Sequence, residues 1–406
     1  MNIINITKFH LKKNKISKNA IKVLHRLKKT GYQAYLVGGS IRDLLLEKKP
    51  KDFDITTNAT PEELRKIFRN CRLVGKRFRI AHVMFRSEFI EVSTFRGPQK
   101  NFSKQHNQKR TKNSNNGMLL SDNIFGNIEE DAHRRDITIN ALYYDIHNHC
   151  IRDYVKGMID LNKKIIRLIG DPETRYREDP IRILRVIRFS VQLNMKISQK
   201  TAEPISRLAQ LLKNIPSARL FNEIIKLLNT GKIYHIYKKI KQFNLFQSLS
   251  LFSTLTLSTK NKRLIKFMSI KILKQIDINI KKNIYNNPTP EFFLSAILWY
   301  LLMAITNNFQ TEKKIEKHEA FLLSVNNVLS ECNTLLSLPK QTIITIKEIW
   351  KYQLNIDQIL KNKTIKKPNL TILNNTYQLL LLRAETEQNI KLYDIAQYLI
   401  HYNKTL

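Results

Sequence analysis

The chain has 406 residues, more than one ordinary compact core holds, which favours two or three domains. A hydrophobic fraction of 42% is enough to bury real cores, and a formal net charge of +37 favours polyanionic partners such as RNA, DNA or anionic lipid. The three cysteines stand far apart without a CxxC pair, which suits a reducing cytosol and argues against a zinc knuckle.

The sequence is rich in Lys, Asn and Ile, the residues that A+T-rich codons favour. Much of its positive charge therefore follows from codon bias, and arginine is the more informative cation. Beyond residue 220 only Arg263 and Arg383 remain, whereas residues 175–189, "RYREDPIRILRVIRF", hold five arginines. A guanidinium group offers a planar fork of donors, so we expect this segment to recognise a ligand by geometry as well as by charge.

The first 150 residues alternate short helices and strands and predict a small α+β sheet domain. An amphipathic helix over 16–31 ends at Gly31, and Thr60 N-caps a further helix that has Pro61 in its first position. The remaining predicted elements are a helix over 40–48 and strands over 32–39, 52–58, 81–85 and 89–95.

Two further features of this region are loops. The polar, cationic stretch 97–122 predicts a mobile loop beside the site. The "HNHC" run at 147–150 predicts a hairpin tip between strands over 141–146 and 151–155, in preference to a structural metal site.

The remainder of the chain predicts helices. All ten glycines lie between Gly31 and Gly231, and prolines interrupt an otherwise Leu/Ile/Lys-rich stretch. The apolar run 292–305 is too short to cross a bilayer and predicts a buried helix, and the N-terminus has no secretory signal, so we expect no transmembrane segment.

Two aspartates carry the clearest chemical signal. Asp52 and Asp54 are spaced to share one face of a strand, and two carboxylates so close repel each other unless a cation lies between them. The turn formed by Gly38, Gly39 and Ser40 predicts a phosphate-binding backbone, and Arg42 lies within the first turn of the helix that follows, where it can reach the same phosphates. Glu91 is a third acid in mid-strand, facing either the same metal ions or solvent.

These segments together resemble the class II nucleotidyltransferases, a family that comprises bacterial poly(A) polymerases and tRNA CCA-adding enzymes. The resemblance rests on ordered motifs that span roughly residues 30–230. The motifs are "LVGGSIRDLLL" (36–46), "KDFDITTNATPEELRKIF" (51–68), "RRDITINALYYD" (134–145), "IRDYVKGMIDLNKKIIRLIG" (151–170), "RYREDPIRILRVIRF" (175–189) and "PSARLFNEIIKLL" (216–228).

The resemblance implies a nucleotidyltransferase head over 1–150, a helical neck over 151–235 that reads the nucleobase, and a helical RNA-binding body and tail over 236–406. It implies that Asp52 and Asp54 are metal ligands for a reaction that uses two Mg²⁺ ions, one on these carboxylates and one on the triphosphate, and Glu91 is a candidate third acid for the first ion. Further implied roles are triphosphate binding by Gly38, Gly39, Ser40 and Arg42; ribose and phosphate contacts by Arg135, Asp136 and Asn140; base reading by Asp179 and Arg182 with Arg185 nearby; helix orientation by Glu178; and bracing by Arg219.

The base-reading role has a physical basis. Asp179 and Arg182 are i and i+3 on a predicted helix and so share a face. An aspartate accepts from the amino group of adenine and an arginine donates to the neighbouring ring nitrogen. Cytosine presents the same pattern, so this pair selects A or C over G or U and leaves A and C unseparated.

The segment "LVGKRFRIAHV" (73–83) separates the two kinds of enzyme, because it resembles the pattern typical of bacterial poly(A) polymerases. We therefore predict a cytoplasmic, monomeric polynucleotide adenylyltransferase that adds AMP from ATP to RNA 3′ ends and acts with RNA-degradation proteins. The alternatives are a tRNA CCA-adding enzyme and a non-catalytic RNA-binding protein with a decayed head. The decayed head is disfavoured because Gly38, Gly39, Asp52 and Asp54 are all present.

Overall fold

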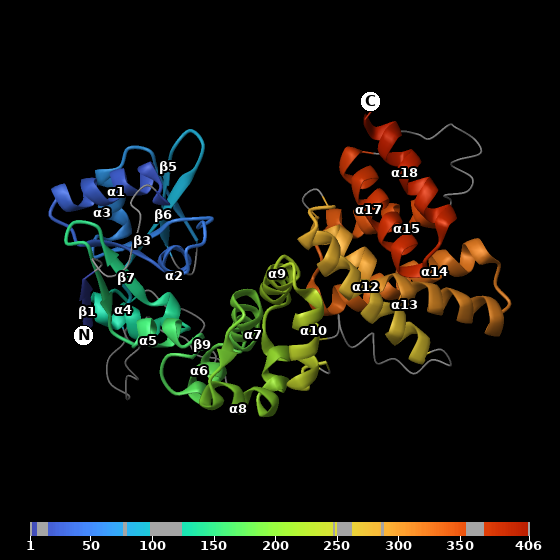
Figure 1. The fold of residues 1–406 in the computed structure, drawn as a ribbon, viewed down its shortest axis with the longest axis horizontal. Coiled ribbons are helices and arrows are strands. Elements are labelled where there is room, and N and C mark those ends of the chain that lie inside the picture. The colour runs from blue at the N-terminus through green and yellow to red at the C-terminus, as the bar shows by residue number, and fades with distance from the viewer. Residues whose placement is uncertain are drawn as a thin grey trace, which may run out of the picture. The chain divides into compact units, whose positions relative to one another are not determined.

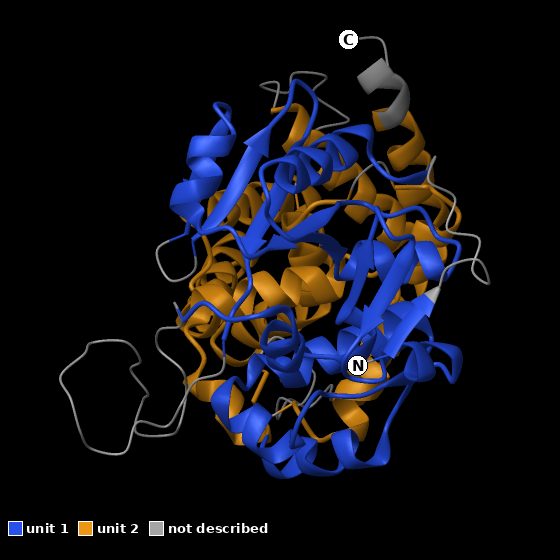
Figure 2. Ribbon diagram, turned by 90° about the vertical axis from the view of Figure 1, so that its left-hand side faces the viewer, with its two compact units in different colours: residues 1–208 blue, residues 209–406 orange. Residues whose placement is uncertain are grey.

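The computed structural model describes residues 2–5, 15–75, 79–97, 124–246, 248–249, 262–285, 288–354 and 369–404. The chain divides into two compact units, residues 1–208 and 209–406 (Figure 2). The three-part division with boundaries near residues 150 and 235 stays a prediction. The predicted loop over 97–122 lies outside the described residues except at Gly97.

The first unit is built on one mixed eight-stranded sheet (Figure 1). In spatial order its strands are β1 (Asn2–Asn5), β8 (Cys150–Asp153), β7 (Leu142–Asp145), β2 (Ala34–Val37), β3 (Asp54–Thr57), β6 (Phe89–Thr94), β5 (Ile80–Met84) and β4 (Cys71–Val74). Neighbouring strands are antiparallel except β3 and β6, which run parallel. The predicted α+β head with a mixed sheet is confirmed.

Local sequence signals account for the helices of this unit. Helix α1 (Lys18–Lys29) begins at Ser17, whose side chain accepts two backbone N–H groups, and it buries Ala20, Val23, Leu24 and Leu27 at helical spacing. Helices α2 (Gly39–Leu45), α3 (Pro61–Ile67) and α4 (Ile128–Arg134) are each about two turns long. Both α3 and α4 carry a capping box, and the predicted Thr60 cap is confirmed.

A close backbone approach joins the chain on either side of the undescribed segment 98–123. Gly97 N–H donates to Ile124 and Gly126 N–H donates to Phe95. A Cβ built on Gly126 would lie 2.4 Å from the Cα of Gly97, so a larger residue there would force the two strands apart. The two glycines thus fix the end of β6 against the start of α4.

The first unit ends in short elements that follow the sheet. They are α5 (Gly157–Asn162), β9 (Ile165–Ile166), α6 (Pro172–Glu178), α7 (Ile181–Leu193), β10 (Lys196–Ile197) and α8 (Gln199–Arg207). Strands β9 and β10 form a separate parallel pair. Helix α7 is buried along most of its length and contributes residues to the core of the first unit.

The described elements of the second unit are helices, as predicted. They are the 3₁₀ helix η4 (Ala209–Asn214), α9 (Ser217–Leu228), α10 (Ile233–Gln242), α12 (Lys262–Lys281), α13 (Pro290–Glu312), α14 (Lys317–Leu336), α15 (Lys340–Leu354), α17 (Leu370–Glu387) and α18 (Ile390–Lys404). Helix α13 is central, since it contacts α12, α14, α15 and α17. Trp350 of α15 is fully buried and donates its indole N–H to the Ser295 carbonyl of α13 at 3.1 Å.

The helix that contains the apolar run 292–305 extends beyond the run at both ends. Helix α13 has 23 residues and is, among the described residues, the single helix long and apolar enough to cross a membrane by length and composition. Of the most apolar 18 residues of this helix, 61% are buried inside the protein, as in the core helix of a globular protein. The predicted burial of this helix is confirmed.

The capping box of α3 gives a direct test of local stability. The Thr60 hydroxyl accepts from Glu63 N–H at 3.3 Å, and the Glu63 carboxylate accepts from Thr60 N–H at 2.7 Å. We expect Thr60→Ala to lower the free energy of unfolding of the first unit by about 1 kcal/mol, because one helix N–H loses its acceptor. Thr60→Ser, which keeps the hydroxyl, is the control in urea titrations. Equal losses in the two variants would contradict this assignment.

Candidate functional site

The predicted carboxylates meet where β3 begins. Asp54 is the first residue of β3 and pairs in register with Val37 of β2 on one side and with Glu91 of β6 on the other. In-register residues of neighbouring strands project from the same face of a sheet, so Asp54 and Glu91 lie side by side. Asp54 is partly buried, whereas the Glu91 side chain is 44% exposed.

The prediction that Asp52 and Asp54 share one face of a strand was wrong. Asp52 precedes β3 and is exposed, so strand alternation does not orient it. The ladder ends at Asp54 because β2 ends at Val37, and Gly38 (φ +83°) then turns the chain into α2. Asp52 is nevertheless near enough for its charge to act on Asp54.

The electrostatics of Asp54 indicate an uncompensated group of acids. Burial, together with the charges of Glu91 and Asp52, raises the pKa of Asp54 to about 6, although the charge of Arg135 opposes this rise. Among the described residues, no three His, Cys, Asp or Glu side chains are close enough together to form a ready-made metal site. The donor set nevertheless suits a hard divalent cation, since it consists of carboxylates whose mutual repulsion a cation would relieve.

The turn at Gly38 lies close to the Asp54 carboxylate. A Cβ built on Gly38 would lie 3.5 Å from Asp54 Oδ2 and 3.9 Å from Arg135 Nη1, and its positive φ disfavours any other residue. Ser40 is buried and its hydroxyl donates to the Val37 carbonyl at 3.1 Å. A Cβ on Gly39 would lie 3.5 Å from Arg42 Nη2. The turn, Asp54 and Arg135 therefore share one small region.

Arg42 lies inside the fold. It is 4% exposed, and it donates to Asn140 Oδ1 at 2.8 Å and to the Asp43 carboxylate at 2.7 and 2.9 Å. Its guanidinium also lies 5.3 Å from the ring centroid of Phe189 in α7. Asn140 ends the 3₁₀ helix η3 (Thr138–Asn140), so Arg42 joins two predicted nucleotide-binding motifs. A phosphate contact by Arg42 stays a prediction.

Arg135 is held by two residues that the sequence analysis did not single out. It donates to Tyr143 Oη at 2.9 Å and to Asp131 Oδ2 at 3.1 Å, and Tyr143 in turn donates to Asp131 at 2.7 Å. Burial lowers the pKa of Arg135, but Tyr143 and Asp131 outweigh it and keep this guanidinium charged. The i, i+4 spacing of Asp131 in α4 and Arg135 at its C-cap was the one sequence signal for this arrangement.

Asp136 forms the next layer of the site. Arg182 Nε donates to Asp136 Oδ1 at 2.7 Å, and Arg185 bonds the other carboxylate oxygen. Burial alone would raise the pKa of Asp136, but the guanidinium groups of Arg185 and Arg182 hold it well below its usual range. The predicted motifs at 134–145 and 175–189 are therefore in direct contact.

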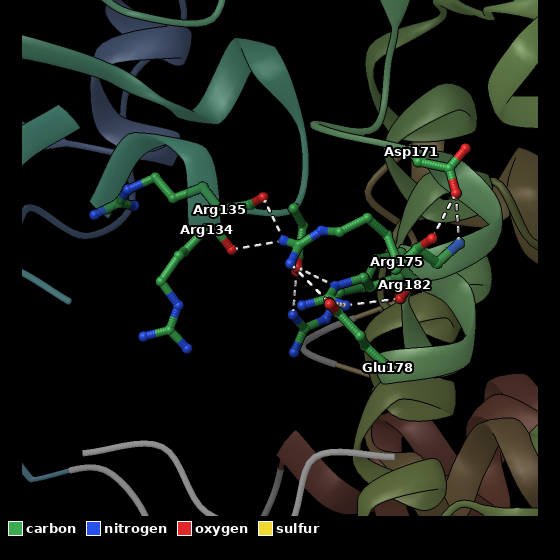
Figure 3. Close-up of polar contacts among 9 residues, drawn as sticks. Arg134, Arg135, Asp171, Arg175, Glu178 and Arg182 are labelled. Carbon is green, nitrogen blue, oxygen red and sulfur yellow. Dashed lines mark hydrogen bonds and ion pairs between the residues drawn. The ribbon is translucent and has the colours of Figure 1, made fainter. Parts of the chain in front are cut away.

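Arg175 and Glu178 of α6 complete this layer (Figure 3). Arg175 Nη2 donates to the carbonyls of Arg134 and Arg135 at 2.7 and 2.8 Å, which terminates α4. The Glu178 carboxylate accepts from Arg175 at 2.9 Å and from Arg182 at 3.1 Å. Figure 3 shows the side chains of Arg134 and Arg135 extending away from this cluster. Glu178 thus links α6 to α7, and its role in orienting the base-reading helix stays a prediction.

The expected shared helix face of Asp179 and Arg182 was wrong. Helix α6 ends at Glu178 and α7 begins at Ile181, with Asp179 in an extended conformation between them (φ −150°, ψ 91°). The cause is Pro180, which disfavours a helical conformation in the residue before it. Base reading by Asp179 and Arg182 stays a prediction. Arg219 lies on α9 in the second unit, and its bracing role also stays a prediction.

The Asp136 ion pairs give a second stability test. We expect Asp136→Asn to destabilise the first unit by about 3 kcal/mol, because the buried Arg182 and the partly buried Arg185 lose their charged partner. A depressed folded-state pKa contributes stability above the ordinary value of 3.8 and loses it as pH falls. The difference between wild type and variant should hold from pH 8 to 5 in urea titrations and shrink only below about pH 4.

Glu173→Gln is the matched control, since Glu173 also pairs with two arginines, Arg177 and Arg207, but at the surface. We expect little effect from it. An Asp136→Asn loss no larger than that of Glu173→Gln would show that the buried ion pairs are not stabilising.

Three family models match the chain. They are described as "Poly A polymerase head domain" (residues 34–167), "Probable RNA and SrmB- binding site of polymerase A" (194–252) and "Polymerase A arginine-rich C-terminus" (313–403). The last stretch has a single arginine here, Arg383, whose guanidinium bonds Gln353 and lies over Trp299. Arg383 therefore has a structural role within the second unit.

Curated proteins and solved structures agree with these matches. Poly(A) polymerase I of Salmonella typhi is 47% identical over 98% of this chain and 85% of its own length. The CCA-adding enzyme of Lactobacillus helveticus is 38% identical over 51% of this chain and 49% of its own length. The Bacillus stearothermophilus CCA-adding enzyme, solved with CTP, shares the fold with a TM-score of 0.64 at 23% identity, covering 95% of this chain and 82% of that one. The chain belongs to the poly(A) polymerase family.

Proposed function

We propose that the chain adds AMP from ATP to RNA 3′ ends without a template and releases pyrophosphate. The observation that carries this proposal is the pairing of Asp54 with Glu91 beside the Gly38 turn and Arg135. Carboxylates next to a glycine turn and a fixed guanidinium suit nucleotidyl transfer, because the carboxylates can bind metal ions while the turn and the guanidinium bind the phosphates.

The incoming nucleotide is assigned to the side of Asp54 formed by the Gly38 turn and Arg135. Arg135 stays charged and is fixed by Asp131 and Tyr143, so it offers a preorganised donor to a phosphate. Arg182 donates to Asp136, so the two side chains lie together. We assign the Asp136 carboxylate to the ribose and the Arg182 guanidinium to the base. Gly39, Ser40, Arg42 and Asn140 support this turn.

Asp54 and Asp52, with Glu91, would hold two Mg²⁺ ions. When bound, these ions lower the pKa of the attacking 3′-OH and stabilise the leaving pyrophosphate. The raised pKa of Asp54 supports this assignment, since it reflects burial and neighbouring carboxylates that a cation would neutralise.

Polymerisation is favoured over CCA addition by the extent of similarity. The chain covers 85% of the Salmonella typhi poly(A) polymerase I but 49% of the Lactobacillus helveticus CCA-adding enzyme. The distinguishing segment 73–83 lies partly outside the described residues, at 76–78. We further propose that the second unit binds the RNA backbone through its lysines, and that the protein acts in the cytoplasm as a monomer, with RNA-degradation proteins as partners.

A nucleotide and primer assay tests this function. With ATP alone and a homopolymeric RNA, we expect long 3′ tails, because no template or second nucleotide is required. With tRNA that lacks CCA, supplied with ATP and CTP, we expect no preference for CMP. Denaturing gels give tail length and composition. CMP incorporation confined to tRNA would instead support a CCA-adding enzyme.

Substitution of Asp54 tests the site itself. We expect Asp54→Asn to lower AMP transfer by roughly 1000-fold, since charge stabilisation worth several kcal/mol is lost. RNA affinity, measured by filter binding at fixed salt, should stay near wild type. Glu62→Gln is the control, because it removes a carboxylate of the same unit that pairs with Arg79 at the surface. Unchanged transfer by Asp54→Asn would refute the site.

A further inference from the structure

We infer that Phe89, lying flat against His82, forms a stacking platform for the 3′-terminal base of the RNA. This inference rests on the proposed function and extends it to the second substrate. It assigns a role to His82, the histidine of the segment 73–83 that the nucleotide site leaves unused.

The platform lies on the same face of the sheet as the carboxylates. Along β6, buried and accessible residues alternate, so Phe89 and Glu91 share the accessible face, whereas Ile90, Val92 and Thr94 are buried. Two strand residues span about 7 Å. The platform is therefore adjacent to Glu91 and, through it, to Asp54.

Phe89 is unusual because it is 47% exposed and yet ordered against a partner. Its ring centroid lies 4.5 Å from that of His82, with 17° between the planes. A large apolar ring held in a fixed plane at an accessible surface suits stacking by a nucleobase, which every base can provide through its π-face. His82 Nε2 also lies 3.6 Å from Glu91 Oε1, which links the platform to the acids.

The geometry of the reaction favours RNA over ATP at this position. In an in-line displacement the attacking and leaving oxygens lie on opposite sides of the phosphorus atom. The proposed triphosphate site, Gly38 and Arg135, lies on the β2 side of Asp54. The 3′-OH must then approach from the β6 side, where Glu91, His82 and Phe89 lie.

A cation stands at the outer end of the same row. Arg72 of β4 pairs in register with His82, which pairs with Glu91, which pairs with Asp54. Arg72 is exposed and suits a phosphate of the RNA strand upstream of the stacked base. The row thus offers, in order, a phosphate contact, a base platform and the acids.

The test uses the full-length protein and short RNAs that carry 2-aminopurine at the 3′ end or three nucleotides inward. Without ATP or divalent ions, we expect wild type to quench the terminal probe more than the inner one, because a stacked base loses fluorescence. Phe89→Tyr, which keeps a flat ring, should retain this quenching, and Phe89→Leu should lose it. In transfer assays, Phe89→Leu should raise KM for RNA about tenfold and leave KM for ATP unchanged.

Phe125→Leu is the control, since Phe125 is 50% exposed in the same unit but lies outside β5 and β6. Phe89→Leu with wild-type quenching and wild-type KM for RNA would overturn the inference. So would a rise in KM for ATP instead of RNA, which would assign the ring to the incoming nucleotide. Either result, obtained with an active wild-type enzyme, would leave the proposed function standing, whereas a wild type that transfers no AMP would overturn the proposed function.

Discussion

The parallel pairing of β3 with β6 is the constraint on which the site depends. It is the single parallel contact of the described head sheet, and its register sets Asp54 opposite Glu91. On the other edge of β3, Val37 is the last partner before the turn at Gly38. A shift of one residue in either ladder would turn Asp54 toward the core and separate it from both neighbours.

A web of charged groups attaches the helices of the first unit to this sheet. Arg175 caps the end of α4 through two carbonyls, and Asp136, just before η3, is bonded to α7 through Arg182. Arg42 adds a second link, from α2 to Asn140. Because these groups are largely buried, each depends on its partners, and the loss of one leaves an uncompensated charge. Three of the five arginines at 175–189, namely Arg175, Arg182 and Arg185, take part in these contacts.

Features encoded in neighbouring residues could be predicted from the sequence. The Thr60 cap with Pro61, the hairpin of β7 and β8 and the helix closed by Gly31 depend on local conformational preferences, and each is present. The ordered motifs likewise indicated which residues belong to one site. Two predictions were wrong because they used residue spacing alone and ignored the residues that end a strand or a helix. Asp52 lies ahead of its strand because the Gly38 turn ends the ladder, and Pro180 separates Asp179 from the helix that carries Arg182.

Other features could not be predicted, because tertiary contacts fix them. Tyr143 of β7 bonds Arg135 at the end of α4, and His82 meets Phe89 only through the register of β5 and β6.

The most direct test of the central claim is a crystal structure with a non-hydrolysable ATP analogue and Mn²⁺, in which anomalous scattering locates the ions. The account predicts manganese bound to the Asp54 carboxylate, with the triphosphate on the side of Gly38 and Arg135. Manganese bound away from Asp54, or a triphosphate on the side of Glu91 and Phe89, would contradict it.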